Sequence, residues 1–504
     1  MPYRTTAMAA LLSLKKFPHR LLALAICLAG VNVLLGAALC VAGIYTSSAH
    51  GNSTTGVNRT GLNNATSGED YAIGNCAHCH EQHASVEGGE PEPQGGPDRY
   101  LGMDLEENLC THCHGLPAGN GAGGAPDDIK TDISKTGGRH YMAVSDSAHQ
   151  ANETQSRITG NLHVECTDCH NPHAAGKTKH TPGGETVATE ISTSSPLYKA
   201  TGVVPTFSTA NWTAPTTYSA IQTATKEYQV CFKCHSGAVG NPATWSGTSG
   251  TGSLEWTDVG LEFSPYNMSG HPIVTGMNNY TNALQVNRGG SLYKGLYNTT
   301  DGLQWDQMLN PWSATGTQTM YCSDCHSSNS TVAGPHGSAY KWMLGGTNKA
   351  WPFTTAASNG ASAGTYRSIK TLYSWDAAYQ QGLGTDDGCF CWNCHPANNQ
   401  GNNTHMNGNH RGAFCVDCHI RVPHGGKVSR LIAAENSVSF SNLPARYTAN
   451  GQGNDSHGGT QPAIRKFTKV ANWSYNASKC YADYAVPSPS CAYHNNAANG
   501  TESW

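Results

Sequence analysis

Cysteine and histidine recur along this chain in one fixed pattern, Cys-x-x-Cys-His. The sequence has 504 residues with 19 cysteines and 24 histidines, and chance alone would give on the order of 0.03 matches to this pattern. Seven are present: Cys76/Cys79/His80, Cys110/Cys113/His114, Cys166/Cys169/His170, Cys231/Cys234/His235, Cys322/Cys325/His326, Cys391/Cys394/His395 and Cys415/Cys418/His419. Such an excess indicates that the seven segments share one chemistry.

The spacing within the pattern is what covalent haem attachment requires. Two thiols separated by two residues can form thioethers with the two vinyl groups of one porphyrin, and the following histidine can coordinate the iron as the proximal ligand. Disulfides or zinc knuckles would explain the paired cysteines, but not the histidine after every second cysteine. The sequence therefore predicts seven c-type haems, each containing iron, bound by the seven motifs.

The other histidines decide whether each iron would have one protein ligand or two. Sixteen lie at or after His50, more than the seven that complete bis-histidine ligation needs. Six-coordinate iron suits an electron carrier, whereas an enzyme keeps one position open for substrate. We predict as distal ligands His83, His149, His173, His271, His336, His410 and His424.

Local pattern supports several of these choices. His83 and His173 each follow a proximal histidine by three residues. Proline precedes His173, His336 and His424, and it follows His271. Because proline restricts the local backbone, it helps to hold a loop that presents a ligand.

Some assignments have competitors. His140 and His163 compete with His149, and His405 competes with His410. These alternatives remain open at the level of sequence.

Three further histidines are interpreted differently. His78 and His112 lie inside their own attachment motifs, where reaching that iron is geometrically unfavourable, so we predict structural roles for both. His50, the expected mature N-terminus, is a weaker candidate for ligation in a neighbouring subunit.

Three cysteines beyond the N-terminal segment fall outside the pattern. Cys480 and Cys491 lie near each other in a tail containing Pro and Ser, and we predict a disulfide between them, worth about 2 to 4 kcal/mol. Cys389 precedes Cys391 by two residues. Attachment through Cys389 and Cys394 is an alternative, although the standard pair is favoured.

The N-terminus has the features of an export signal. Positive charges precede an apolar run from Leu21 to Ile44, and small residues precede His50. We predict that residues 1–49 are a signal peptide, with an uncleaved anchor as the alternative. The expected location is extracellular or at the cell surface, with no membrane contact after cleavage, where thiols end as disulfides or cofactor bonds.

Charge and surface motifs limit the partners. The formal net charge is only -4 and no strongly basic run is present, which argues against nucleic-acid binding. Fourteen Asn-x-Ser/Thr sequons occur, roughly twice the number that composition would give. We predict a surface glycoprotein, with composition as the alternative explanation of the sequons.

The elements that must position these residues are expected to be small. About 65 mature residues per haem are too few for a conventional core around each porphyrin, so the haems themselves would form much of the core. Residues 85–98 and 117–127 are rich in glycine and proline. The predicted fold class is mostly irregular coil with short helices at the motifs and a few short strands, organised around a chain of covalently bound haems.

The expected organisation has three parts after the signal. Residues 50–180 form an N-terminal three-haem region, 181–430 a four-haem region, and 431–504 a C-terminal tail. The Thr/Ser/Ala-rich run 186–225 would supply either a small β-hairpin or a strand that pairs with a neighbouring subunit.

Four segments carry a family resemblance: Tyr228–His235, Ser269–Pro272, Gly334–Ser338 and Val422–Gly425. With the motifs, they resemble the doubled-CXXCH multihaem c-type cytochromes, and more narrowly the extracellular cytochrome nanowire (filament) subunits of metal-reducing bacteria and archaea. The similarity covers 227–494 well and 75–173 at motif level only. It implies bis-histidine haems in a continuous stack and a head-to-tail homopolymer, with one histidine ligand donated between subunits. His83 and His149 are the leading candidates for the donated residue.

The predicted function is electron conduction along the haem chain, as a secreted, polymerising subunit. A multihaem oxidoreductase with one open haem and a monomeric soluble electron shuttle are the alternatives. No Cys-x-x-Cys-Lys variant appears and spare histidines are abundant, so we predict no catalytic residue and interpret the chain as a carrier rather than an enzyme.

Overall fold

The computed structural model describes residues 43–58, 71–80, 106–115, 127–142, 164–239, 257–276, 285–288, 291–294, 310–312, 317–345, 390–394, 419–420, 422–427 and 431. Several sequence predictions lie outside these residues: most of the export segment, the distal candidates His83, His149 and His410, their competitors His163 and His405, the sixth proximal histidine His395, the seventh pair Cys415 and Cys418, Cys389, and the predicted disulfide between Cys480 and Cys491.

Six of the attachment motifs lie on short helices within the described residues. The second and fourth motifs end α2 (Glu106–His114) and α5 (Glu227–His235), and the third begins α4 (Cys166–Cys169). The first, fifth and sixth lie on 3-10 turns, η1 (Cys76–His78), η6 (Cys322–Asp324) and η9 (Phe390–Asn393). Because residues three apart share one helical face, each turn presents both cysteines of its motif to the same side.

Side chains near the first cysteine fix where these helices begin. Within the motifs, Asp168 accepts the backbone N–H of Glu165 at 2.9 Å and Asp324 accepts that of Tyr321 at 2.8 Å. In α5, Gln229 accepts the N–H of Lys226 at 3.1 Å. Each bond satisfies one of the backbone donors that a helix leaves free at its N-terminus.

The described strands form four separate two-stranded antiparallel ladders. Two are local hairpins, in which β2 (Gly202–Thr206) pairs with β3 (Thr217–Ile221) and β5 (Gln285–Arg288) pairs with β6 (Ser291–Lys294). The other two join segments far apart in the chain: β1 (Gly138–Arg139) pairs with β7 (Gly337–Ser338), and β4 (Ser269–Gly270) pairs with β8 (Gly425–Gly426).

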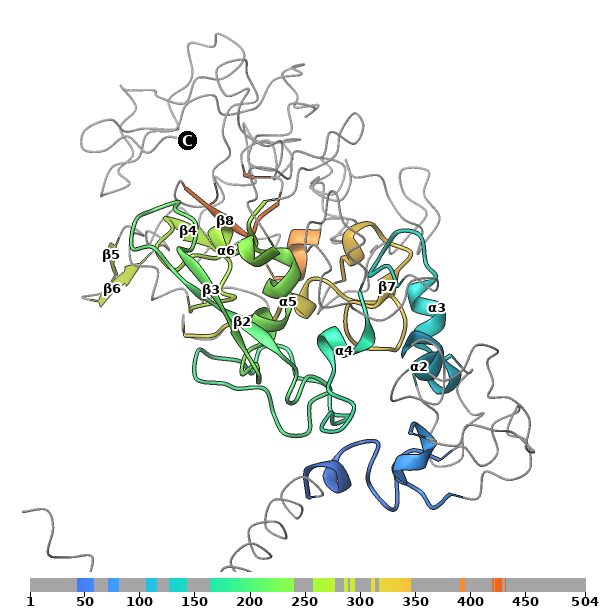
Figure 1. Cartoon of the computed structure of the whole chain (residues 1–504). Helices are drawn as coiled ribbons and strands as arrows, with labels where there is room; N and C mark the ends of the chain where they lie inside the picture. Colours follow the sequence, from blue (N-terminus) through green and yellow to red (C-terminus); the bar gives the residue numbers. More distant parts are fainter. Residues whose placement is uncertain are drawn as a thin grey trace, which may run out of the picture.

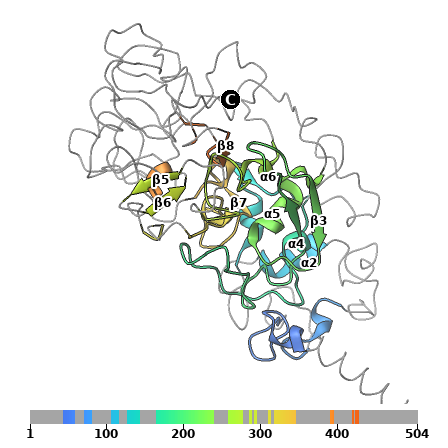
Figure 2. The same ribbon diagram turned by 90° about the vertical axis from the view of Figure 1, so that its left-hand side faces the viewer.

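The β2–β3 hairpin lies within the Thr/Ser/Ala-rich run 186–225 and packs beside α5 (Figures 1 and 2). Of the two outcomes expected for this run, the structure forms the hairpin. Val203 of β2 belongs to an apolar cluster with Phe232, Phe263, Ile273, Trp312 and Met320, and Cys322, Cys325 and Cys394 pack against that cluster. The apolar core therefore extends to the attachment cysteines.

Two short helices, α3 (Ile129–Ile133) and α6 (Val259–Glu262), begin alike. Each is N-capped by an aspartate: Asp128 accepts the N–H of Thr131 at 3.0 Å, and Asp258 accepts that of Gly260 at 2.8 Å. Each also has a completely buried acidic residue four positions after the cap, Asp132 in α3 and Glu262 in α6. These shared features mark α3 and α6 as corresponding elements.

Each of these helices also supports one long-range ladder through a glycine. A Cβ at Gly337 of β7 would overlap the carbonyl oxygen of Asp132, and one at Gly425 of β8 would overlap that of Glu262. Only glycine allows such a close approach of two backbones. Figure 1 shows β7 near α3, and β4 and β8 near α6.

Two 3-10 turns, η2 (Gly237–Val239) and η7 (Lys341–Met343), complete the described helices. Among the described residues, no helix has the length and apolar character needed to cross a membrane.

Candidate functional site

Five of the proximal histidines each face a histidine from another part of the chain. The distances between ring centroids fall in a narrow range: 5.8 Å for His80 and His173, 6.1 Å for His114 and His50, 6.0 Å for His170 and His336, 6.0 Å for His235 and His140, and 6.1 Å for His326 and His424.

This spacing is suited to a metal ion between the rings. An iron bound by two imidazole nitrogens, each at about 2 Å, would separate the two ring centroids by roughly 6 Å. Two imidazoles joined by a direct hydrogen bond would have their ring centroids closer together than this. The five centroid separations are thus those that bis-histidine ligation would give.

The distal rings are positioned by an arrangement that we call a histidine clamp. In a clamp, a segment ending in histidine runs antiparallel to a segment beginning with Pro-His. The first histidine donates its Nδ1–H to the proline carbonyl. The three clamps pair His50 with Pro172–His173, His140 with Pro335–His336, and His271 with Pro423–His424.

The second and third clamps are the long-range ladders β1–β7 and β4–β8. His140 donates its backbone N–H to the carbonyl of His336 at 3.2 Å, and His271 donates to that of His424 at 2.8 Å. The first clamp is less regular and has a backbone bond from Ala49 to Ala175 at 2.8 Å. A clamp therefore brings two histidines together, and in the first two clamps both of them face the histidine of an attachment motif.

The orientation of the rings follows from these bonds. His50 Nδ1 lies 3.0 Å from the Pro172 carbonyl, and His140 Nδ1 lies 2.7 Å from that of Pro335. Proximal rings are held similarly, since Nδ1 of His170 lies 3.0 Å from the Pro196 carbonyl and Nδ1 of His326 lies 2.8 Å from that of Trp342. Donation through Nδ1 leaves Nε2 as the nitrogen available to a metal.

Burial keeps several of these imidazoles neutral. Desolvation lowers the pKa of His326 to about 4, and the facing His424 adds to the shift. Desolvation likewise lowers the pKa of His336 to about 4, with His170 contributing next. The neutral ring is the form that binds a metal, so the fold provides these histidines in the ligand state.

The second cysteines of the first, second and fourth motifs lie one turn after the first cysteines. Cys79 donates its backbone N–H to the Cys76 carbonyl at 3.1 Å, and Cys113 and Cys234 lie in the last turns of α2 and α5. All three are partly buried. Burial, followed by the charges of Cys76 and Cys79, raises the pKa of Tyr45 to about 12. The structure therefore places Cys79, Cys113 and Cys234 as attachment needs, while their bonding to haem stays a prediction.

The seventh motif is represented in the described residues by His419. This residue is partly buried, and the buried Ile420 that follows it donates its backbone N–H to the Leu431 carbonyl at 2.8 Å. The five facing pairs do not include His419, and Cys415 and Cys418 lie outside the described residues. The structure thus brings five of the seven proximal histidines opposite a second histidine, and in three of these pairs the second histidine is a predicted distal ligand. The proximal role of His419 stays a prediction.

The cysteines of successive motifs lie beside one another. A hydrogen bond between Cys166 and Cys110 is the largest cause that raises the pKa of the Cys166 thiol, and a hydrogen bond between Cys231 and Cys322 has the same effect on Cys231. Burial, followed by the charge of Cys231, raises the pKa of Cys169 to about 12. The second to fifth motifs therefore form a row in chain order.

The row continues to the sixth motif. Burial first, and then the charge of Cys394, raises the pKa of the Cys325 thiol well above its ordinary value. The charge of Cys391 contributes in the same direction. The fifth and sixth motifs are therefore neighbours as well.

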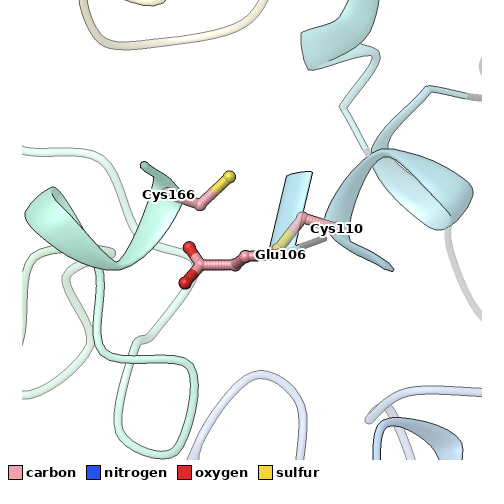
Figure 3. Close-up of side chains that lie close together, drawn as sticks. All are labelled: Glu106, Cys110 and Cys166. Carbon is pink, nitrogen blue, oxygen red and sulfur yellow. The ribbon is translucent and has the colours of Figure 1, made fainter. Parts of the chain in front are cut away.

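Two carboxylates join motifs within the row, and we call each of these contacts a carboxylate staple. Glu106, four residues before Cys110, accepts the backbone N–H and the hydroxyl of Thr167, each at 2.7 Å. Figure 3 shows Glu106 reaching from α2 toward the helix that bears Cys166. Glu227, four residues before Cys231, accepts the N–H of Ser323 at 2.8 Å and its hydroxyl at 2.7 Å.

Each staple lies among sulfur atoms. The ligand atoms of Glu106, Cys110 and Cys166 lie within 4.8 Å of one another, and those of Glu227, Cys231 and Cys322 do the same. These two groups have the composition of small metal sites, but their cysteines belong to the attachment motifs. We assign the carboxylates to joining the motifs.

Comparison with known protein families, with curated proteins and with solved structures gives no match.

The structure places the predicted distal ligands in three ways. His173, His336 and His424 face proximal histidines. His271 lies in the third clamp with its Nδ1 on Pro423. His83, His149 and His410 lie outside the described residues.

Two other histidines face proximal histidines, although neither is among the predicted distal ligands. His140, which competed with His149, faces His235. His50, considered for a neighbouring subunit, faces His114 of its own chain because its segment pairs with Ala175. His78 is buried, and its Nε2 lies 3.1 Å from the Ala72 carbonyl, an arrangement compatible with the structural role predicted for it.

The carboxylates of the staples were not identified from sequence. A signal for them exists, because glutamate occurs four residues before the first cysteine of the second and fourth motifs, and Thr or Ser follows the first cysteine of the third and fifth. Only their proximity in space gives that signal meaning.

Proposed function

We propose that this protein is a secreted heptahaem c-type cytochrome that conducts electrons along a row of haems. The observation that carries the proposal is the set of five facing histidine pairs, with ring centroids 5.8 to 6.1 Å apart. Each pair joins the histidine of an attachment motif to a second histidine from a different segment. Metal coordination is the chemistry that this arrangement suits.

The residues present fit a covalently bound haem. The paired cysteines would form the thioethers, and the facing histidines would be the two axial ligands. When bound, the haem iron would supply reversible one-electron exchange. The chain's own contribution is to hold neutral imidazoles by their Nδ1 atoms, so that both ligands stay in place in either oxidation state.

The order of the motifs supports conduction rather than seven isolated sites. The second to sixth motifs lie in sequence along one row, and contacts between cysteines or carboxylate staples join each to the next. Short separations are required for rapid electron transfer between centres. A continuous row therefore suits a conductor that receives electrons at one end and releases them at the other.

We further propose that the subunits polymerise head to tail, with one histidine ligand donated between subunits. The support is the resemblance to filament subunits, together with the principle that a heterologous contact which does not close produces a fibre. His50 faces its own chain's His114, which leaves His83 and His149 as the candidates for donation. Electron microscopy of the native protein should show filaments, and a protein that stays monomeric at all concentrations would contradict this part.

Export and glycosylation are also proposed, and the structure distinguishes between sequons. Asn267 is completely buried, and its amide donates to the carbonyls of Leu261 and Glu262. Asn329 is exposed. Peptide mass spectrometry should therefore find any glycan at Asn329 rather than at Asn267.

Two measurements test the central proposal. A pyridine haemochrome assay should give seven haems per chain, and the mass should exceed that of the cleaved polypeptide by seven haems plus any glycans. Electron paramagnetic resonance of the oxidised protein should show only low-spin ferric signals. A count of six or fewer would contradict full loading, and a stoichiometric high-spin iron that binds nitrite or sulfite would favour an enzyme.

A further inference from the structure

Glu262 is a buried carboxylate beside the third clamp that takes no part in cofactor attachment. Its side chain has 0% exposure, and both oxygens are engaged. Oε1 accepts the hydroxyl of Thr257 at 2.5 Å, and Oε2 lies 2.6 Å from Nδ1 of His424. Because an ionised carboxylate only accepts hydrogen bonds, His424 carries its proton on Nδ1, and its Nε2 is the nitrogen available toward His326.

The first histidine of each clamp has a weaker acceptor. His50 and His140 donate to neutral proline carbonyls. His336 follows proline in the second clamp as His424 does in the third, and its Nδ1 is buried without an acceptor among the described residues. His424 thus differs from its counterpart in having an anionic acceptor.

The corresponding helices explain the difference. Asp132 of α3 occupies the position that Glu262 occupies in α6, but its side chain is one methylene shorter. Its carboxylate is bound by the Lys135 ammonium and accepts the hydroxyl of Ser330 at 2.6 Å. The shorter side chain serves other partners and leaves the ring of His336 without a carboxylate bond.

We infer that Glu262 is a positioning residue that makes His424 a more electron-rich ligand than His336, and so gives the fifth haem a lower reduction potential than the third. The inference rests on the proposed function. A carboxylate draws the Nδ1 proton more strongly than an amide carbonyl does, which raises the basicity of Nε2. Asp132 places a buried charge near His336 as Glu262 does near His424, so the difference between the two sites lies in the hydrogen bond to the ring.

This difference would matter for conduction. The third and fifth sites alternate with the fourth along the row, and their proximal histidines both donate to backbone carbonyls, of Pro196 and Trp342. The distal acceptor is therefore the main difference between the two ligand sets. An electron moving along the row would therefore meet a lower reduction potential at the fifth site than at the third.

The test is a redox titration of the full-length holoprotein with Glu262→Gln. Glutamine keeps the size and an acceptor oxygen but removes the charge, so one of the redox transitions should move to higher potential. One low-spin electron paramagnetic resonance signal should shift its g values as the ligand loses electron density. Glu262→Asp should move both in the same direction, because the shorter side chain in α3 does not reach its ring.

Asp132→Asn is the matched control. It removes a carboxylate that is equally buried but does not bond a clamp histidine, so the low-spin signals should keep their g values. Unchanged potentials in Glu262→Gln would overturn the inference. So would a new high-spin iron, because Glu262 would then only hold the ring in place. Failure of the proposed function itself would be seen separately, as missing haems or high-spin iron in the unmodified protein.

Discussion

The histidine clamps and the carboxylate staples hold the row together in different ways. A clamp joins segments 122 to 195 residues apart through backbone and proline carbonyls, and it brings together two candidate axial histidines. A staple is one glutamate that binds the N–H and hydroxyl of a single Thr or Ser. The two alternate, because the second clamp serves the third and fourth motifs whereas the staples join the second to the third and the fourth to the fifth.

This difference separates two tasks. The position of the ligands depends on backbone hydrogen bonds. Substituting one side chain alters these bonds little, unless the new side chain blocks the close approach of two backbone segments. Spacing between neighbouring motifs depends on a side chain that can be removed. Clamp variants should therefore change iron ligation, whereas staple variants should change stability only.

The largest effect is expected from Gly337→Ala in the second clamp. The added methyl group would overlap the carbonyl of Asp132, so β7 must move away from α3. We expect up to two of the seven irons to become high-spin, because His140 and His336 belong to the same clamp, and a loss of about 1 to 3 kcal/mol of stability from overpacking. Electron paramagnetic resonance and thermal unfolding measure the two effects.

Gly184→Ala is the control for this substitution. A Cβ at Gly184 would lie 3.4 Å from its nearest neighbour, the Thr181 carbonyl oxygen, which is ordinary contact. This variant should retain seven low-spin haems and nearly unchanged stability. Retention of low-spin iron in Gly337→Ala would show that the clamp does not set the ligands.

A smaller effect on ligation is expected from His336→Ala, which removes a single distal ring. Only the iron at His170 should become high-spin or water-ligated, while the covalent haem count stays at seven. His78→Gln is the comparison, because His78 is buried against the Tyr71 ring and its Nε2 lies at the Ala72 carbonyl. High-spin iron in His78→Gln but not in His336→Ala would reverse the assignment.

The clamps also show how far the sequence leads. The Pro-His pattern predicts His173, His336 and His424 as ligands, and the proline beside His271 predicts that residue too, because proline restricts the backbone of a loop. His50 and His140 have no adjacent proline, since they are held by a proline carbonyl from a segment more than 100 residues away. No local pattern can specify such a partner, and only the antiparallel pairing identifies it.

The fold shows the same division. Short helices at the motifs were predictable because the spacing of the two cysteines suits a helical turn, and the run 186–225 has the composition of a hairpin. The ladders β1–β7 and β4–β8 have two residues in each strand. Strands of that length leave no periodic signal, and long-range pairing alone defines them.

Removing a staple should leave ligation intact. Glu227→Ala would leave the N–H and hydroxyl of Ser323 without their partner in a buried setting, at a cost of about 1 to 3 kcal/mol. Glu106→Ala should cost less, because Glu106 and its partner Thr167 are more exposed and water can replace the carboxylate. Chemical denaturation ranks the two variants, and a high-spin signal in either one would erase the distinction between staples and clamps.

The smallest effect is on the pH dependence of stability, and it comes from the acidic residues around the Glu227 staple. Glu185 lies near Asp324 and His180, and burial, followed by the charge of Asp324, raises its pKa to about 6. The unfolded value is 4.5, so the folded state favours the protonated acid. Its contribution to stability is therefore present below pH 4.5 and is lost as the pH rises through about 6.

Glu185→Gln should remove this dependence. Desolvation lowers the pKa of His180, but the hydrogen bond to Asp324 and the nearby negative charges together outweigh it, and the net pKa is raised. His180 therefore gives the pH dependence of stability a slope of the same sign, and the wild-type curve alone cannot isolate Glu185. Relative to wild type, Glu185→Gln should therefore gain stability between pH 4.5 and about 7, as measured by denaturant unfolding at each pH. Equal slopes for wild type and Glu185→Gln would mean that the acidic cluster at the staple carries no pH sensitivity of its own.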